Sequence, residues 1–361
     1  MKFNARLNAR LNSRLFSFLL SGVIVAFITF TTTSNVAANM GASIDANMEV
    51  SSIGLGGDHG YQDFPLLQKI NKVIYGEDNR VEAILCSNKV YRQLALSTAA
   101  QIMNENLHND EDKGTVTISA GTLQENMGVC KNERFFNQLT AANCSGFLVG
   151  ADILVTAGHC VESVSDCANH SWVFDYRLPV AADYGLNTSE SAGVAGGAGG
   201  AGKISSITVA KSSVYTCVEV IGRMMDSEFD YAVLRLDRKV GDRRPLAFRH
   251  TGKIADGTPV MVIGHPSGLP TKIADGAKVR DNSSEGFFVT NLDTYGGNSG
   301  SAVFNIASGE VEGILVRGAT DYVTASGKDC RVSNRCSNEG CRGEDVTRIT
   351  VANELKNIPA Y

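Results

Sequence analysis

The sequence predicts an all-β protein, built as a barrel or a sandwich. Short runs of β-branched and apolar residues recur along the chain, turns rich in glycine, asparagine and aspartate separate them, and long helical patterns are few. The expected strands are residues 115–119, 144–149, 153–156, 203–209, 231–236, 259–264, 286–291, 301–305 and 311–316. Residues 94–102 fit a strand or a short helix, and one helix is expected at the C-terminus, at about 350–357.

Residues 1–38 have the pattern of a secretory signal peptide. Four basic residues precede the apolar run 15–30, and the small residues 36–38 follow it, so we expect cleavage after Ala38. The alternative is an uncleaved membrane anchor, but the apolar run is shorter than the typical span of about 20 residues. The prediction is a secreted or periplasmic protein with no stable membrane association after cleavage.

Two further segments differ in composition from the rest. Residues 39–72 are rich in Gly, Ser and Asn, as expected for a propeptide or a flexible N-terminal extension, so the folded domain is predicted to span 73–361. Residues 187–202 are rich in Gly and Ala and predict a flexible surface loop. This loop is not a phosphate-binding loop, because no Lys-Ser/Thr pair opens a helix after it.

Charge and size exclude some functions. The chain has 361 residues, 43% of them hydrophobic, and a formal net charge of -5. Loss of Lys2, Arg6, Arg10 and Arg14 with the signal peptide takes this charge from -5 to -9. An acidic chain without a basic patch argues against nucleic acid as a partner.

Nine cysteines behind a signal peptide predict disulfides, and the odd number leaves one cysteine unpaired. A zinc site is the alternative for Cys330, Cys336 and Cys341, but the chain has no Cys-x-x-Cys pair and no histidine lies near this group. No metal or other cofactor is expected.

The turn Gly296-Gly297-Asn298-Ser299-Gly300-Ser301 runs directly into an apolar strand. Such a turn can present a serine hydroxyl, so Ser299 is the candidate nucleophile. Gly297 has no side chain to block a substrate carbonyl, and its N–H and that of Ser299 can together face an oxyanion. An ordinary turn is the alternative interpretation.

Two residues upstream supply the partners of a nucleophilic serine. His159 follows the apolar strand 153–156 and lies beside Cys160, where an imidazole can act as a general base. Asp230 begins the apolar run 231–236 and can accept the Nδ1 proton of His159, whereas Asp226 and Glu228 do not adjoin that run. Considered alone, His159 is more simply a structural histidine and Asp230 an acid in an ordinary turn. Together with Ser299, however, they supply a base, an acid and a nucleophile, in the chain order His159, Asp230, Ser299.

Four motifs together resemble the trypsin/chymotrypsin superfamily of serine proteases, and most closely its bacterial glutamyl-endopeptidase-like branch. They are Thr156-Ala157-Gly158-His159-Cys160, Asp230-Tyr231-Ala232-Val233-Leu234, Gly264-His265-Pro266-Ser267-Gly268 and Gly296-Gly297-Asn298-Ser299-Gly300-Ser301. The resemblance covers about residue 80 to the C-terminus. It implies two six-stranded antiparallel β-barrels with the site in the cleft between them, a barrel boundary near 237–253, and a disulfide from Cys144 to Cys160 and another from Cys167 to Cys217. Cys86, Cys130, Cys330, Cys336 and Cys341 stay unassigned.

The resemblance also implies a specificity pocket. Asp293 takes the position whose acid in trypsin-like enzymes pairs with a substrate Arg or Lys. Thr294 resembles the glutamate-specific branch, but Leu315 stands where that branch has its pocket histidine, in the run Leu315-Val316-Arg317-Gly318. Arg317 fits either preference, since it can neutralise Asp293 or attract an acidic side chain. Cleavage after basic residues is favoured over cleavage after acidic ones.

One further departure limits what can be inferred from the family. Asn298 replaces the aspartate that pairs with a new N-terminus in trypsin-like zymogens, so that activation switch is not expected. His265 is expected to support the fold. The prediction is a serine endopeptidase acting on proteins or peptides, in an oligomeric state that the sequence does not specify. The alternatives are an acid-specific endopeptidase and a protease-fold binding module without turnover.

Overall fold

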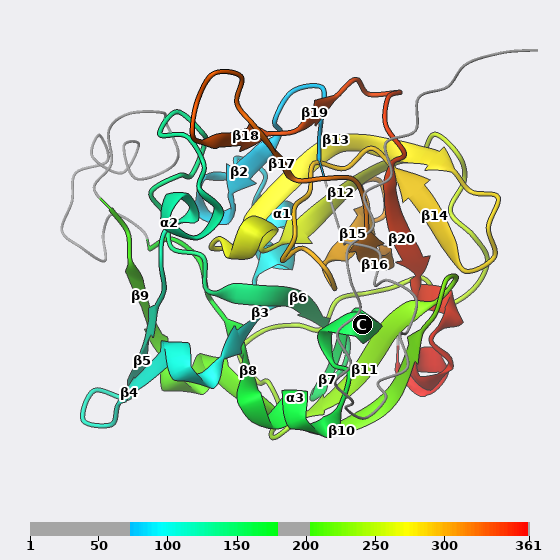
Figure 1. Ribbon diagram of the computed structural model, residues 1–361. Coiled ribbons are helices and arrows are strands. Elements are labelled where there is room, and N and C mark those ends of the chain that lie inside the picture. The colour runs from blue at the N-terminus through cyan, green and yellow to red at the C-terminus, as the bar shows by residue number, and fades with distance from the viewer. Residues whose placement is uncertain (1–72, 180–202, 360–361) are drawn as a thin grey trace, which may run out of the picture. The chain divides into compact units, whose positions relative to one another are not determined.

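The computed structural model describes residues 73–179 and 203–359, and most of its strands form two closed antiparallel barrels (Figure 1). The predicted signal peptide, the predicted propeptide 39–72 and the predicted Gly-Ala loop 187–202 lie outside the described residues. The all-β class and the double barrel expected from the family resemblance are confirmed.

The first barrel has six strands in the spatial order β10-β11-β7-β6-β3-β8. These strands are β3 (Thr98–Met103), β6 (Ala142–Leu148), β7 (Ile153–Thr156), β8 (His170–Phe174), β10 (Val214–Met225) and β11 (Asp230–Leu236). β10 is the longest, and two irregularities in its pairing with β11 bend it around the barrel.

The second barrel follows in the chain after residues 237–258, which contain no strand. Its six strands are β12 (Pro259–Gly264), β13 (Lys272–Asp281), β14 (Phe287–Thr290), β15 (Ala302–Asn305), β16 (Val311–Arg317) and β20 (Glu344–Arg348). The pairing of β12 with β13 closes this barrel, and β2 (Arg80–Glu82) adds to its β13 edge. A segment from the start of the domain is therefore part of the second barrel.

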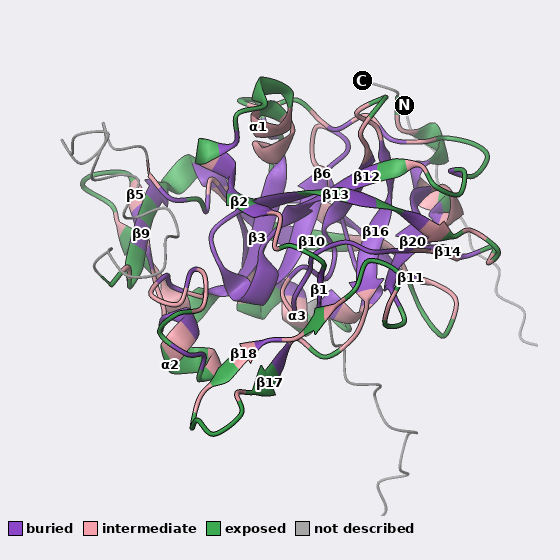
Figure 2. Cartoon of the chain, turned by 90° about the horizontal axis from the view of Figure 1, so that it is seen from above, coloured by how far each residue is buried: buried purple, intermediate pink, exposed green. Residues whose placement is uncertain are grey.

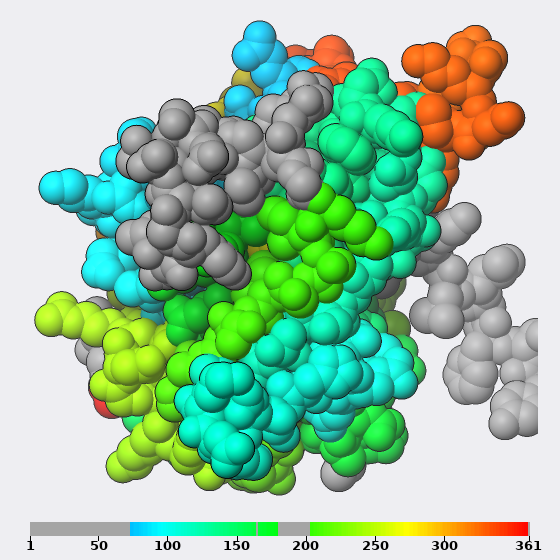
Figure 3. Space-filling view, turned by 90° about the vertical axis from the view of Figure 1, so that its left-hand side faces the viewer, coloured from blue at the N-terminus to red at the C-terminus, as the bar shows by residue number. Residues whose placement is uncertain are grey.

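Smaller elements surround the barrels. A three-stranded sheet contains β4 (Leu107–Asp110), β5 (Thr115–Ser119) and β9 (Ser206–Ala210), which lie side by side on the face seen in Figure 3. β1 (Ile74–Tyr75) pairs with β19 (Arg335–Cys336), and β17 (Tyr322–Thr324) pairs with β18 (Arg331–Ser333). The α-helices are α1 (Lys89–Ala95), α2 (Leu123–Met127) and α3 (Val164–Asn169).

Two expectations about helices are refined by the structure. The stretch 94–102, expected to be a strand or a short helix, contains the end of a helix followed by a strand, since α1 ends at Ala95 and β3 begins at Thr98. The C-terminal helix is of the 3₁₀ type, in the segments Ile349–Val351 and Asn353–Asn357. Short tight helices of this type are common at such positions.

The buried residues form cores inside the barrels and between them (Figure 2). The largest apolar cluster contains Leu154 and Val233 from the first barrel and Met261 and Phe304 from the second. β20 is also wholly buried, although four of its five residues are polar or charged. Those side chains need partners in the interior, and Glu344 among them lies beside the site described below.

Four disulfides join eight of the nine cysteines. The structure pairs Cys144 with Cys160 and Cys167 with Cys217, the two bridges expected from the resemblance, and adds Cys130 with Cys330 and Cys336 with Cys341. Cys86 is the unpaired cysteine and is buried.

Within residues 73–179 and 203–359, no helix has the length and apolar character needed to cross a membrane.

Candidate active site

His159 and Asp230 form a close pair in the first barrel. One carboxylate oxygen of Asp230 lies 2.8 Å from His159 Nδ1, and the other accepts the backbone N–H of His159 at 3.1 Å. Two contacts from one carboxylate fix both the backbone and the ring of His159. Because Nδ1 is engaged, the imidazole presents Nε2 as its remaining nitrogen.

The pairing of β7 with β11 brings His159 and Asp230 together. β7 and β11 are neighbours, with Ala232 opposite Thr156, so the start of β11 lies beside the 3₁₀ turn Gly158–Cys160 that carries His159. The Arg223 guanidinium donates to the Gly158 carbonyl at 2.8 Å, and the Cys144–Cys160 disulfide ties the turn to β6.

Asp230 is buried, and two opposing effects act on its ionisation. Burial would raise the pKa of Asp230, but the hydrogen bonds and the charge of His159, with a contribution from Arg317, hold that pKa below its ordinary value. Asp230 is therefore an anion at neutral pH, as needed to fix the His159 tautomer and to stabilise an imidazolium.

The Ser299 turn packs against the middle of β6 and the end of β7, the strand that precedes His159. Cys160 Sγ lies 3.7 Å from the Ser299 carbonyl oxygen, which also accepts the Ser145 N–H at 2.8 Å. A Cβ on Gly300 would lie 2.0 Å from the Ser145 carbonyl oxygen and 2.2 Å from the Thr156 hydroxyl, so only glycine allows this approach. The structure thus brings Ser299 to β6 and to the end of β7, which leads to His159.

Hydrogen bonds hold both polar backbone groups of Gly296. The Gly296 N–H donates to Asp321 at 3.0 Å, and the Gly296 carbonyl accepts the Ser267 N–H at 2.5 Å. In a trans peptide the C=O and N–H point in opposite directions, so the Gly297 N–H points away from Ser267. Gly297 itself has a φ of +87°, and a Cβ there would lie 2.5 Å from the His265 carbonyl oxygen.

Ser145 holds the next peptide of the turn. Its hydroxyl donates to the Gly297 carbonyl at 2.8 Å and accepts the His265 N–H at 3.0 Å. Together with its bond to the Ser299 carbonyl, Ser145 contacts both residues whose N–H groups are predicted to bind an oxyanion. Sequence reasoning placed Ser145 only in a strand, although its position after Cys144 was a usable signal.

The motif 264–268 supports this turn. His265 is fully buried, donates from Nδ1 to the Leu269 carbonyl at 3.1 Å, and has a pKa lowered to about 3 by burial. It therefore stays neutral and structural, consistent with the expectation from sequence. Ser267 adopts a φ of +54°, unusual for a non-glycine residue, and its hydroxyl lies 2.7 Å from that of Tyr322.

Asp293 is bound by the start of the domain. Its two carboxylate oxygens accept the backbone N–H groups of Tyr75, at 2.7 Å, and Asn79, at 2.8 Å. Burial raises the pKa of Asp293 to about 6, and its two backbone hydrogen bonds offset only part of that rise. In this structure the Asp293 carboxylate is thus directed toward the segment 75–79.

The other predicted pocket residues lie on both sides of the Ser299 turn. Leu315 and Val316 are buried core residues of β16, and the Gly300 N–H donates to the Leu315 carbonyl at 2.8 Å. Arg317 ends β16 and lies 3.7 Å from Asp345. Thr294 donates its hydroxyl to Glu344 at 2.5 Å, and Gly318 packs against the same carboxylate, so Glu344 is a site residue that sequence reasoning missed.

One cluster has the composition of a metal site. The ligand atoms of Cys144, His159 and Cys160 lie within 4.8 Å of one another, the single such group in the described part of the chain. Both sulfurs belong to a disulfide and cannot act as thiolate ligands, so this cluster does not fit a metal ion.

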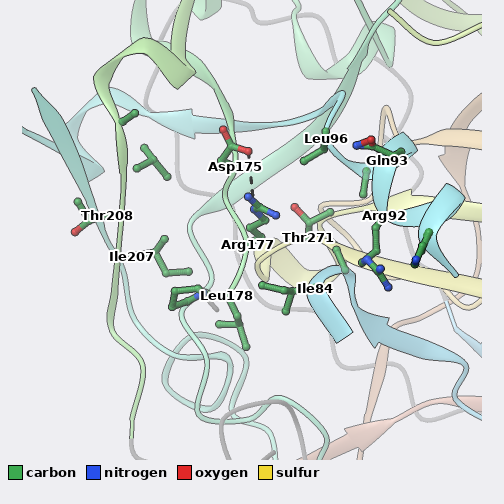
Figure 4. A pocket seen from close by; sticks show the side chains of 16 residues that line it. Ile84, Arg92, Gln93, Leu96, Asp175, Arg177, Leu178, Ile207, Thr208 and Thr271 are labelled. Atoms are coloured by element: carbon green, nitrogen blue, oxygen red, sulfur yellow. Dashed lines mark ion pairs between the residues drawn. The ribbon is translucent and has the colours of Figure 1, made fainter. Parts of the chain in front are cut away.

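A large cavity has a lining that is separate from the candidate catalytic residues. It has a volume of about 870 Å³, and its lining includes Ile84, Arg92, Leu178 and an Asp175–Arg177 ion pair of 3.9 Å (Figure 4). None of His159, Asp230 or Ser299 lines it.

The chain is similar to a known protein family over part of its length. Residues 144–314 match the family described as the trypsin-like peptidase domain. No curated protein matches the chain. Among solved structures, a Glu endopeptidase in complex with MPD is 16% identical, with a TM-score of 0.42 over 78% of this chain and 97% of that one.

Two further solved structures are similar at the same low level. The Rv3671c protease from M. tuberculosis, in its active form, is 14% identical with a TM-score of 0.38 over 83% of this chain and 96% of that one. The VesB protease of Vibrio cholerae is 13% identical with a TM-score of 0.40 over 77% of this chain and 65% of that one. The family match over residues 144–314 confirms the resemblance to the trypsin/chymotrypsin superfamily that the motifs indicated, and this part of the chain is similar to a trypsin-like peptidase domain.

Proposed function

We propose that this chain is a secreted serine endopeptidase in which His159, Asp230 and Ser299 form the catalytic triad. The observation that carries the proposal is the packing of the Ser299 turn against β6 and against Cys160, the neighbour of an imidazole that is already oriented by Asp230. Nucleophile, base and orienting acid in this order are the parts that acyl transfer needs.

The proposed reaction proceeds in two halves. His159 Nε2 takes the Ser299 proton as the hydroxyl attacks the scissile carbonyl, and the imidazolium then protonates the leaving amine. Water repeats the cycle on the acyl-enzyme and releases the acid product. The N–H groups of Gly297 and Ser299 stabilise the oxyanion in both halves, and loss of one such donor typically costs about 3 to 4 kcal/mol.

We further propose that the protein acts in an oxidising compartment, reached through a signal peptide at 1–38, with residues 39–72 as a propeptide or extension and 73–361 as the protease domain. Four disulfides support this location, because such bonds persist outside the reducing cytosol. Cleavage after Lys or Arg is the proposed preference, and cleavage after acidic residues is the alternative.

The test is labelling of the purified protein with a fluorophosphonate, followed by peptide mapping and a peptide-hydrolysis assay. We expect a single adduct on Ser299. Ser299→Ala is expected to lose the adduct and to lower kcat by about 10⁶, with its melting temperature nearly unchanged. Ser308→Ala, the same chemical change at an exposed turn, serves as the matched control.

Two results would contradict the proposal. Unimpaired turnover in Ser299→Ala would exclude the triad. A folded wild-type protein that neither reacts with the reagent nor hydrolyses peptides would favour a binding module with this fold. The intact mass of the labelled protein also locates the mature N-terminus.

A further inference from the structure

Glu344 is a buried acid that lies between two predicted pocket residues. It is the first residue of β20, opposite Thr290 of β14, and its exposed fraction is 0%. Its carboxylate accepts the Thr294 hydroxyl at 2.5 Å, and Thr294 is five residues before Ser299.

The second contact of Glu344 comes from the opposite side. A Cβ built on Gly318 would lie 2.0 Å and 2.2 Å from the two Glu344 carboxylate oxygens. The carboxylate therefore fills the space that a side chain at 318 would take, directly after β16. An acid thus sits where the segments 293–294 and 315–318, both predicted to line the pocket, approach each other.

The two other acids near this region, Asp345 and Asp293, have partners other than Thr294 and Gly318. Successive strand residues point to opposite faces, so Glu344 and Asp345 face different sides of β20. Asp345 lies 3.7 Å from Arg317 and 2.5 Å from Arg342. Asp293, the acid expected from the family to select the substrate, instead accepts two backbone N–H groups of the segment 75–79.

We propose that Glu344 is the specificity-determining acid of this protease, and that it selects substrates with Lys or Arg before the scissile bond. The inference rests on the proposed function, since it assigns the pocket of that same site. A buried carboxylate interacts strongly with a cation that reaches it, because the surroundings screen charge poorly. An acidic substrate side chain would meet like charge there, and a neutral one would form no ion pair with the acid.

The experiment measures binding and selectivity separately. Binding of the cationic probe p-aminobenzamidine is followed by its fluorescence in the wild type and in Ser299→Ala, which needs no turnover. Selectivity is the ratio of kcat/KM for peptides that differ only in Lys, Arg, Glu or Leu before the cleaved bond. Fluorophosphonate labelling and melting temperature report whether each variant is folded and active.

Three variants assign the acid. Glu344→Gln is expected to weaken amidine binding at least about thirtyfold and to abolish the preference for basic peptides, while Ser299 still labels. Glu344→Asp keeps the charge and should retain that preference even if Glu344→Gln folds poorly. Glu339→Gln changes an exposed acid in the loop before β20 and is the matched control.

The outcomes separate this inference from the proposed function. Asp293→Asn tests the rival acid: loss of amidine binding there, with binding kept in Glu344→Gln, overturns the assignment. The assignment of Glu344 is also overturned if the wild type prefers Glu peptides, or if neither the wild type nor Ser299→Ala binds the amidine. In either case, labelling of Ser299 would still support the proposed hydrolase. Amidine binding that depends on Glu344, in a protein without turnover, would support the pocket and reject the protease.

Discussion

The proposed base and the proposed nucleophile are held by contacts of different kinds. His159 lies at the end of a regular strand, and its partner Asp230 begins the neighbouring strand of the same barrel. The Ser299 turn depends on parts of the chain far from it, with contacts from Ser145 in the first barrel, from Ser267, and from Asp321.

Asp230, beside the proposed base, and Asp293, near the proposed nucleophile, also differ in the groups that bind their carboxylates. Asp230 faces an imidazole, whose hydrogen bonds and charge outweigh burial and lower its pKa. Asp293 is met by backbone N–H groups, which do not outweigh burial, and its pKa is raised. Asp230 lies beside a group that can become a cation and stays ionised, whereas the contacts of Asp293 suit an anchor for the segment 75–79. Burial alone does not identify a catalytic acid.

The largest expected change in activity tests the contact between Asp230 and the proposed base His159. Asp230→Asn should lower kcat by about 10⁴, because an amide leaves His159 in the wrong tautomer and does not stabilise an imidazolium. Steady-state kinetics on a peptide substrate measures this loss. Asp226→Asn removes an exposed acid close in sequence and should leave kcat unchanged; equal losses in both variants would mean that Asp230 has no special role.

The second effect tests the anchoring role of Asp293. A carboxyl whose pKa rises on folding, here from 3.8 to about 6, contributes stability that is complete below pH 3.8 and is lost as the pH rises through 6. The shift corresponds to about 3 kcal/mol in the free energy of unfolding. Asp293→Asn cannot ionise and should remove this pH dependence in urea unfolding between pH 4 and 7.

The exposed Asp256 provides the control for that experiment, since Asp256→Asn should keep the wild-type pH dependence. Parallel stability curves for the wild type and Asp293→Asn would show that the carboxyl of Asp293 does not change its ionisation on folding.

The smallest effect tests the support of the oxyanion peptide. Tyr322→Phe removes the 2.7 Å hydrogen bond to the Ser267 hydroxyl, and Ser267 holds the Gly296 carbonyl. We expect kcat to fall by about tenfold, which is the size of one buried hydrogen bond. KM should change little, because the Gly297 N–H acts mainly in the transition state. Tyr91→Phe on α1 is the control, and a change confined to KM would contradict the positioning role.

The places of His159, Asp230 and Ser299 next to strands could be predicted from the sequence. His159, Asp230 and Ser299 each adjoin an apolar strand, so local patterns give both the element and the end at which the side chain lies. These motifs also carried the family resemblance, and hence the double barrel.

The remainder of the site could not be predicted in this way. Glu344, Asp345 and Arg348 are charged residues of one strand, yet all are buried. Their partners include Thr294 and Ser284, which lie at least 50 residues away in the sequence. Asp293 was assigned by its distance from Ser299, but its hydrogen bonds come from residues more than 200 positions earlier. Such pairings depend on the tertiary structure, which local periodicity does not encode.

The Cys130–Cys330 bridge has a consequence for biosynthesis. Its cysteines are 200 residues apart, and Cys144, Cys160, Cys167 and Cys217 lie between them. A chain made from its N-terminus exposes these four thiols while Cys130 still awaits its partner. Cys144 and Cys160, only 16 residues apart, can pair early, whereas Cys130 is a ready nucleophile for exchange with any bridge already formed. Correct oxidation therefore depends on the early bridges being sequestered in the folded first barrel, or on an isomerase, before the ribosome completes the chain.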